Sequence, residues 1–443
     1  MKVSKLPVNP GPAAWNKLLA DPAPATPLEG RQTADWLVIG AGFAGLAAAR
    51  RLSQLNPGDT IVILEAGRVA EGPAGRNSGF MIDLPHDLSS SDYGGALDAD
   101  LAQTQANRAG IRFAAEMAAD YGLTEEAFSP SGKVNAAATE KGHAHNLAYA
   151  SHLAAMGESY TLINEAGMRE MTGTNYYHSG LFTPGTAMIQ PAMFVRGVAD
   201  GLRSNRVRIL ENSPVTELTR KRNWIAKTPG GQVTAPRVIL AVNGHANSFG
   251  FFPSRLMHVF TYASMTQPLG AREISKLGGN PVWGVTPADP LGTTVRRVSG
   301  TGGDRIIIRN RFTYDPMMQV SDRRISRVAQ DHDRAFAARF PMLSGVGMEY
   351  RWGGMLCLSR NAVPAFGERD KGLFLACCQN GLGTAKGTLS GMLAAELASG
   401  HNSKMLRQFM AAEDPERLPP EPLTWIGANA TMRWGEMRAG KEF

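Results

Sequence analysis

Three glycines near the N-terminus have the spacing of a loop that binds a dinucleotide phosphate. Gly40, Gly42 and Gly45 stand in "DWLVIGAGFAGLAAARRL" at 35–52 and match the pattern G-x-G-x-x-G. The first glycine permits a tight turn, the second lets the main chain approach a pyrophosphate, and the third lets a helix pack against a strand. Phe43 and Ala44 fall at the start of that helix, where unpaired N–H groups favour negative charge.

The elements that must position these glycines are present on both sides of them. Residues 36–40, "WLVIG", form an apolar run typical of a strand buried in a parallel sheet, and a second such run, "TIVILEAG" at 60–67, ends with Glu65 and Ala66. Glu65 stands twenty residues after Gly45, where a carboxylate accepts from the adenosine ribose hydroxyls. It would repel a 2'-phosphate, so NADP is disfavoured and FAD and NAD remain open.

Four later stretches carry a resemblance to a known family. They are "LEAGRVAEGPAGRNSGFM" at 64–81, "MIQPAMFVRGVADGLRSNRVRILENSPVTEL" at 188–218, "WGGMLCLSRNAVPAFGE" at 352–368 and "GLFLACCQNGLGTAKGTLSGMLAAELASG" at 372–400. Together with the glycine turn they resemble the FAD-dependent oxidoreductases of the D-amino-acid oxidase superfamily. The arm with Trp15 is similar to the amine-oxidising branch typified by gamma-glutamylputrescine oxidase.

The resemblance implies that FAD is bound noncovalently by segments far apart in the chain. We expect Arg76 to meet phosphate, while small side chains let the main chain pass close to a flat ring. We also expect the helix near Gly383 to direct its N-terminus at the flavin pyrimidine edge, where it would stabilise negative charge on the reduced ring. The further residues implied for the cofactor site are Asn77, Ser78, Gly79, Val215, Asn243, Gly244, Gly381, Leu382 and Thr384.

The resemblance also implies an α/β fold in which a Rossmann-like FAD-binding domain of the glutathione-reductase type is interleaved with a mixed-sheet substrate domain. We assign residues 1–33 to an arm on the surface and residues 401–443 to a C-terminal tail. The FAD-binding domain comprises 34–88, 180–254 and 346–400, and the substrate domain comprises 89–179 and 255–345.

The chemistry implied by the family belongs to the flavin. A C–H bond beside an amine nitrogen delivers hydride to flavin N5, and water hydrolyses the resulting imine. Little acid–base machinery is needed, because the substrate need only arrive as a free amine in the right place. We therefore predict oxidation of the C–N bond of an amine or an N-substituted amino acid.

Two departures from the family pattern concern the substrate. Leu356 stands where glycine-oxidase-like members carry an arginine that binds the substrate carboxylate. Ala385 stands where sarcosine-oxidase-like members carry a lysine, and Lys386, one residue later, would point about 100° away on a helix. Our other candidates for the substrate site, beside Lys386, are Arg309, Arg311 and Tyr262.

Arg309 and Arg311 lie on the predicted strand "IIIRNRFTY", and alternation would place both on the same face. Either both then face the substrate or neither does.

Composition narrows the class of protein. The chain has 443 residues, a net charge of +7 and no long basic tract, and we expect a basic surface rather than a nucleic-acid partner. Its three cysteines predict neither a disulfide framework nor a metal site, and its apolar runs fall short of the roughly 20 residues that span a bilayer. We expect a cytoplasmic enzyme without a membrane span, whose partners are its small substrate and oxygen or another electron acceptor.

Three alternatives stay open on the sequence alone. The enzyme could be an amino-acid dehydrogenase that passes electrons to a carrier other than oxygen. It could be an NAD-dependent dehydrogenase, although such an enzyme would not need the C-terminal glycine turn and helix. It could also be a flavin-binding protein without turnover.

Overall fold

A parallel sheet carries the glycine turn. The computed structural model describes residues 1–85, 90 and 93–443. The sheet order is β10 (Val207–Leu210), β3 (Ile61–Leu64), β2 (Trp36–Ile39), β14 (Arg237–Leu240), β21 (Leu373–Cys377) and β20 (Ala365–Asp370). Neighbouring strands run parallel except β20, which pairs antiparallel with β21. Every residue of β2 and β3 is buried, as expected for strands that are covered on both faces.

The two faces of this sheet are covered differently. Helices α2 (Phe43–Leu55), α9 (Ala385–Ala398), α6 (Pro191–Leu202) and α3 (Leu97–Asp120) contribute to the apolar core on one face. The other face packs on a four-stranded sheet of β1 (Gly30–Thr33), β13 (Gly231–Ala235), β12 (Trp224–Lys227) and β11 (Glu217–Arg220). The predicted α/β fold with a Rossmann-like domain is confirmed.

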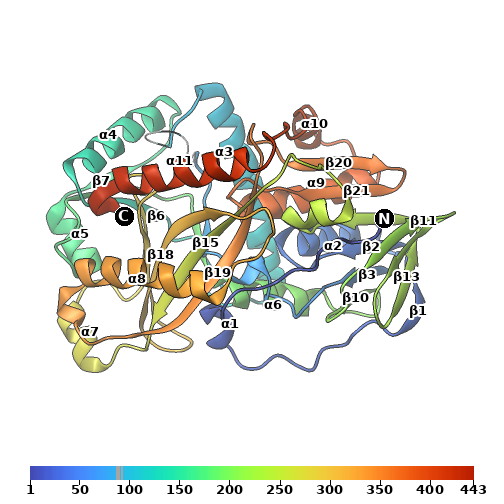
Figure 1. Cartoon of the computed structure of the whole chain (residues 1–443), viewed down its shortest axis with the longest axis horizontal. Helices are drawn as coiled ribbons and strands as arrows, with labels where there is room; N and C mark the ends of the chain where they lie inside the picture. The colour runs from blue at the N-terminus through green and yellow to red at the C-terminus, as the bar shows by residue number, and fades with distance from the viewer. Residues whose placement is uncertain (86–89, 91–92) are drawn as a thin grey trace.

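A second large sheet lies beside the first (Figure 1). Its order is β19 (Met348–Leu358), β15 (Met257–Thr266), β18 (Arg305–Tyr314), β17 (Thr294–Val298), β16 (Trp283–Pro287), β6 (Lys133–Ala137), β8 (Ser179–Thr183) and β7 (Thr161–Ile163). The sheet is mixed because β16 and β6 are parallel while the other pairs are antiparallel. The helices on its periphery are α4 (Glu140–Ala155), α5 (Glu165–Thr172), α7 (Ala271–Leu277) and α8 (Asp322–Arg339).

A third, small sheet is separate from the two large ones. It consists of β4 (Phe80–Met81), β9 (Ala187–Ile189) and β5 (Phe128–Ser129). The short helix α1 (Ala14–Lys17) packs beside it, since the Gln190 side chain donates to the Trp15 carbonyl at 2.8 Å.

The proposed domain boundaries stay a proposal; two strands and one helix pack across them. Strands β8 and β19 belong to the mixed sheet although they fall in the segments assigned to the FAD-binding domain. Helix α3, assigned to the substrate domain, packs on α9 in the apolar core beside the parallel sheet. The proposed boundary between residues 88 and 89 lies outside the described residues.

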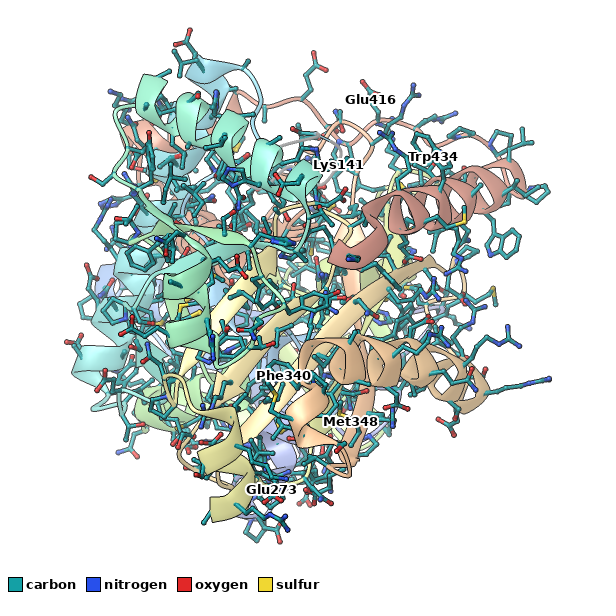
Figure 2. The ribbon with its side chains drawn as sticks, turned by 90° about the vertical axis from the view of Figure 1, so that its left-hand side faces the viewer. Lys141, Glu273, Phe340, Met348, Glu416 and Trp434 are labelled. Carbon is teal, nitrogen blue, oxygen red and sulfur yellow. The ribbon has the colours of Figure 1, made fainter. Side chains whose placement is uncertain are left out.

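The C-terminal segment packs on the mixed sheet. Helix α10 (Lys404–Met410) is followed by α11 (Leu423–Ala439), which packs on the end of β18 that extends beyond β17. The Phe312 N–H donates to Glu436 and the Tyr314 N–H donates to Asn429, each at 3.0 Å. These bonds satisfy an otherwise open strand edge. Trp434 lies on the outer face of α11 (Figure 2), where it is exposed.

Candidate active site

A cavity of about 500 Å³ lies at the carboxyl ends of the parallel strands. Thirteen of the residues that the sequence predicted for the cofactor line it. They are Gly40, Gly42, Phe43, Ala44, Glu65, Ala66, Asn77, Ser78, Val215, Asn243, Gly381, Gly383 and Thr384. Segments from residue 40 to residue 384 therefore meet around one space, which is where a ligand binds in an open α/β sheet.

The glycine turn has the geometry that its spacing predicts. Gly40 has φ +102°, and a Cβ there would lie 2.6 Å from the Ala241 carbonyl oxygen. A Cβ on Gly45 would lie 1.8 Å from the Gly40 carbonyl oxygen, so no other residue fits without moving α2 away from β2. Gly42, by contrast, has only the Ala74 Cβ nearby, at 3.5 Å. Its surroundings leave open space beside the main chain at the start of α2.

Glu65 is held at the edge of the same space. Its Oε2 accepts from the Ala41 N–H at 2.7 Å and its Oε1 from the Gly67 N–H at 3.3 Å. Burial raises the pKa of this carboxyl group, and the N–H groups of Ala41 and Gly67 partly offset that effect. A fixed carboxyl group whose oxygens have further lone pairs suits the ribose hydroxyls predicted as its partners.

Arg76 does not line the cavity, and the expectation that it meets phosphate is corrected. Its Nη1 donates to the carbonyl oxygens of Pro10 and Gly11 at 3.0 Å and of Gly353 at 3.2 Å. Burial lowers its pKa to about 10. The guanidinium thus joins the N-terminal arm to β19.

The arm itself is more than the predicted surface segment. Lys5, Leu6, Pro7 and Asn9 line the cavity and close one side of it. No local pattern in these residues signals that role, because it depends on where Arg76 holds the arm.

The end of the cavity farthest in sequence from the glycine turn contains a polar side chain that the sequence reasoning missed. Gln379 lines the cavity; its Nε2 donates to the Ala376 carbonyl at 3.1 Å, while its buried Oε1 has no hydrogen-bond partner among the described residues. An unpaired buried acceptor costs about 1–3 kcal/mol, and a ligand ring with an N–H group would satisfy it. A glutamine inside the apolar run "LFLACCQNG" is the signal that could have revealed it.

The turn before α9 is built as the sequence predicts. Gly381 has φ +84°, and the Thr384 Oγ1 donates to the Phe80 carbonyl at 2.7 Å. Helix α9 then begins at Ala385. Its N-terminal turn is thereby fixed against β4, beside the cavity.

Four further predicted residues pack around the cavity without lining it. Gly45 contacts Gly40, and Gly79, with φ +80°, makes room for the Arg296 guanidinium. Gly244 packs against His258, and Leu382 belongs to an apolar cluster with Phe80.

Arg311 and Tyr262 do not reach the cavity either. A β-bulge places Arg311 outside the ladder, because Thr261 pairs with Phe312 and Tyr262 with Asn310. Arg311 has φ +64° and forms ion pairs with Asp331 and Glu436. The expectation that Arg309 and Arg311 share a face is therefore wrong.

Tyr262 is buried in a cluster with residues of α8, and its hydroxyl lies 2.7 Å from the Thr313 Oγ1. Lys386 is the second residue of α9 and is half-buried. Its predicted role at the substrate stays a prediction.

Arg309 does not line the cavity either, but its position on the mixed sheet differs from that of the other candidates. Its strand neighbours Ala263 and Ile307 belong to the core shared with the FAD-binding domain, so Arg309 is on the face of the mixed sheet turned toward that domain. Burial lowers its pKa to about 10, and its guanidinium carbon lies 4.4 Å from the centre of the Phe312 ring. Within the described part of the chain no carboxylate pairs with it.

The cysteines and the histidine near the cavity offer no reactive group to it. Cys357, Cys377 and Cys378 are free and buried, and none lines the cavity. His245 lines it, but burial lowers its pKa to about 4 and keeps it neutral. Among the residues with a described placement, no three histidine, cysteine, aspartate or glutamate side chains gather as a metal site, and no helix is long and apolar enough to cross a membrane.

Comparison with known proteins explains this arrangement. Residues 35–397 match the family of the FAD dependent oxidoreductases, DAO. The chain belongs to this DAO family. DAO proteins are FAD-dependent oxidoreductases, so the chain is a flavoenzyme.

The similar proteins cover almost the whole chain. Gamma-glutamylputrescine oxidoreductase of Escherichia coli is 25% identical over 85% of this chain and 86% of its own length. The probable oxidoreductase OrdL of Rhizobium meliloti is 26% identical over 90% of this chain and 91% of its own. The solved glycine oxidase of Geobacillus kaustophilus superposes with a TM-score of 0.70 at 18% identity, covering 88% of this chain and 100% of that one. At that identity the structure shows a shared fold.

Proposed function

We propose that this DAO protein oxidises the C–N bond of a small amine that also carries an acidic group, such as an N-substituted amino acid. Bound FAD supplies the hydride acceptor, and water then hydrolyses the imine product. The chain's own residues bind the cofactor, place the substrate and exclude solvent. Two similar proteins, by their names, act on compounds of this type: gamma-glutamylputrescine oxidoreductase, and the iminodiacetate oxidase of Chelativorans, which shares the fold at 15% identity and a TM-score of 0.67 over 86% of this chain and 100% of that one.

Arg309 is the observation that supports an acidic group on the substrate. A half-buried guanidinium without a carboxylate partner is costly unless an anion completes its surroundings. Arg309 is turned toward the FAD-binding domain, whereas Leu356 stands where a glycine-oxidase-like enzyme has its arginine. We therefore assign the substrate carboxylate to Arg309, which would bind it from the mixed sheet instead of from β19.

The cavity residues also support a mechanism with little acid–base chemistry. The ionisable side chains that line it are those of Lys5, Glu65, Arg68, Glu71 and His245. Of these, Glu65 is held by main-chain N–H groups and His245 is neutral. Main-chain N–H groups at the starts of α2 and α9 instead offer positive dipole ends.

A panel of amines under anaerobic conditions tests this proposal. N-substituted amino acids, dicarboxylic imino acids, polyamines and N-methyl amino acids are mixed with the holoenzyme, and the loss of oxidised flavin absorbance is followed. We expect an acid-bearing amine to bleach the flavin and its amide analogue to fail. If the acid-bearing amine and its amide analogue bleach the flavin at equal rates, Arg309 does not bind a substrate carboxylate. A flavin that no amine of the panel reduces would favour a binding protein. Re-oxidation with oxygen or with an artificial acceptor then separates an oxidase from a dehydrogenase.

A further inference from the structure

A second cavity lies beside the small sheet and is lined in part by Ser129 of β5 and Met188 of β9. It has a volume of about 550 Å³ and shares no lining residue with the first cavity. Helix α1, strands β6, β16 and β17 and the segment before β6 form its walls. Trp15, Phe182 and Trp283 line it with aromatic surface, and the cavity is large enough for a small organic molecule.

Arg296 is the first of two buried cations in this cavity. It is 5% exposed and its Nη1 donates to the carbonyl oxygens of Ser78, Gly79 and Ile189 at 3.0, 3.3 and 2.8 Å. Its Nε is buried without a hydrogen-bond partner, and no carboxylate pairs with it in the described part of the chain. Its guanidinium carbon lies 5.3 Å from the Trp15 ring centre, and burial alone lowers its pKa to about 9.

Lys133 is the second buried cation in this cavity. It is 4% exposed and its ammonium donates to the side chains of Asn135 and Thr286, the latter at 3.3 Å. Both hydrogen-bond partners are neutral. Burial lowers the pKa of the lysine to about 8, although the charge of the Asp83 carboxylate partly offsets that effect. A buried ammonium without a carboxylate close enough to form an ion pair is as unusual as the unpaired guanidinium.

The strand register brings the two cations to one row of the mixed sheet. Arg296 on β17 pairs with Gly284 on β16. On the other side of β16, Thr286 pairs with Asn135, two residues beyond Lys133 on β6. Because side chains alternate along a strand and directly paired residues share a face, Arg296, Gly284 and Lys133 lie on the same face. Two strand spacings separate the cations, about 10 Å between Cα atoms.

The remaining charged groups of the cavity are at its exposed end. Glu125 is exposed, and the Glu126 carboxylate accepts from the main-chain N–H of Thr301 at 3.1 Å and from its hydroxyl at 2.9 Å. Solvent screens these carboxylates, whereas the two cations are shielded from water. The interior of the cavity is therefore the part that selects a ligand by charge.

We propose that this second cavity is a binding site for a small dicarboxylate, with one carboxylate directed at Arg296 and the other at Lys133. An arginine binds a carboxylate through paired N–H donors, and a lysine binds one as a point charge. Arg296 also holds the carbonyl oxygens of Ser78 and Gly79, and Ser78 lines the FAD cavity. Occupation of the site would thus be coupled through Ser78 and Gly79 to the flavin surroundings, as in a regulatory or accessory site.

Calorimetric titration of the holoenzyme with succinate, butanoate and succinamide tests the proposal. The three probes have the same carbon chain with two, one and no negative charges. Succinate should bind about tenfold more tightly than butanoate, since it gains a second charge-assisted bond, and succinamide should not bind measurably. Equal binding of succinate and succinamide, or no binding of succinate, would overturn the proposal.

Single substitutions assign the binding to the two cations. Lys133→Met should lower succinate affinity to that of butanoate and leave butanoate affinity unchanged, while Arg296→Met should weaken both. Lys141→Met, which removes an exposed lysine of the same domain, is the matched control and should change neither. If Arg296→Met fails to fold because three carbonyl oxygens lose their donor, the Lys133→Met result decides alone. An unchanged succinate affinity in Lys133→Met would refute the site.

The site is separable from the proposed catalytic function. Succinate should shift the absorbance spectrum of the bound flavin, and it should lower the rate constant for reduction by an amine without competing with that amine. Strict competition would place succinate in the substrate site and contradict a second site. The calorimetric result does not depend on finding a substrate, so failure of the amine panel leaves this test intact.

Discussion

Substitution of Gly42 and of Gly45, the second and third glycines of the turn, separates the effect of this motif on protein stability from its effect on FAD affinity. Gly45→Ala places a methyl group 1.8 Å from the Gly40 carbonyl oxygen, while ordinary contact needs more than 3.0 Å. Helix α2 must therefore move by more than 1 Å at its N-terminus, and overpacking of this kind costs about 1–3 kcal/mol. Gly42→Ala meets nothing closer than 3.5 Å, so the free energy of unfolding of the apoprotein should change by less than about 0.5 kcal/mol.

The two variants should also differ in how they lose FAD. The methyl group of Gly42→Ala would occupy the space in which we propose that the main chain approaches the pyrophosphate. Loss of one charge-assisted hydrogen bond, worth about 1.5–3 kcal/mol, corresponds to a roughly 10- to 100-fold weaker Kd for FAD. Urea unfolding of the apoprotein measures the first quantity, and flavin fluorescence titration measures the second. Wild-type FAD affinity in the Gly42→Ala protein would refute the assignment of the phosphate to this turn. An equal loss in the free energy of unfolding in Gly42→Ala and Gly45→Ala would refute it too.

Two further predictions concern charge. Arg311→Met removes both ion pairs of a mostly buried guanidinium and should lower the free energy of unfolding by about 3–5 kcal/mol. Arg309→Met should leave the free energy of unfolding nearly unchanged and raise KM for an acid-bearing amine. Urea unfolding and steady-state kinetics measure these two quantities, and the reverse pattern would contradict the assigned roles. Burial raises the pKa of Glu442 to about 7 from an ordinary 4.5, so the folded state binds more protons between these values and stability should fall as pH rises from about 4.5 to about 7, by up to about 1.4 kcal/mol per pH unit. Glu442→Gln should flatten the curve in that window, and an unchanged slope would show that another group is responsible.

The sequence predicts those parts of the site whose structure depends on residues close together in the chain. The strand at 36–40, the glycine spacing and Glu65 all follow from local pattern, because one short segment must form a strand, a turn and a helix. The turn before α9 was predicted by resemblance and has the φ values that glycine provides.

Other features depend on contacts between distant segments, and the sequence does not reveal them. The bulge at Arg311 breaks the alternation that would have placed it beside Arg309, and it exists because α11 and α8 supply carboxylates for that guanidinium. Arg296 and Arg297 are adjacent in "TTVRRVS" and look equivalent. Arg297 pairs with Asp304 at 2.9 Å, whereas Arg296 is on the opposite face and donates to the Ser78 carbonyl, just before β4.

The absorbance spectrum of the purified protein, with added FAD if needed, tests the central claim most directly. The account predicts the two bands of an oxidised flavin at one FAD per chain, released on denaturation because no cysteine lines the cavity. A folded protein that is colourless and remains so after incubation with FAD would contradict it.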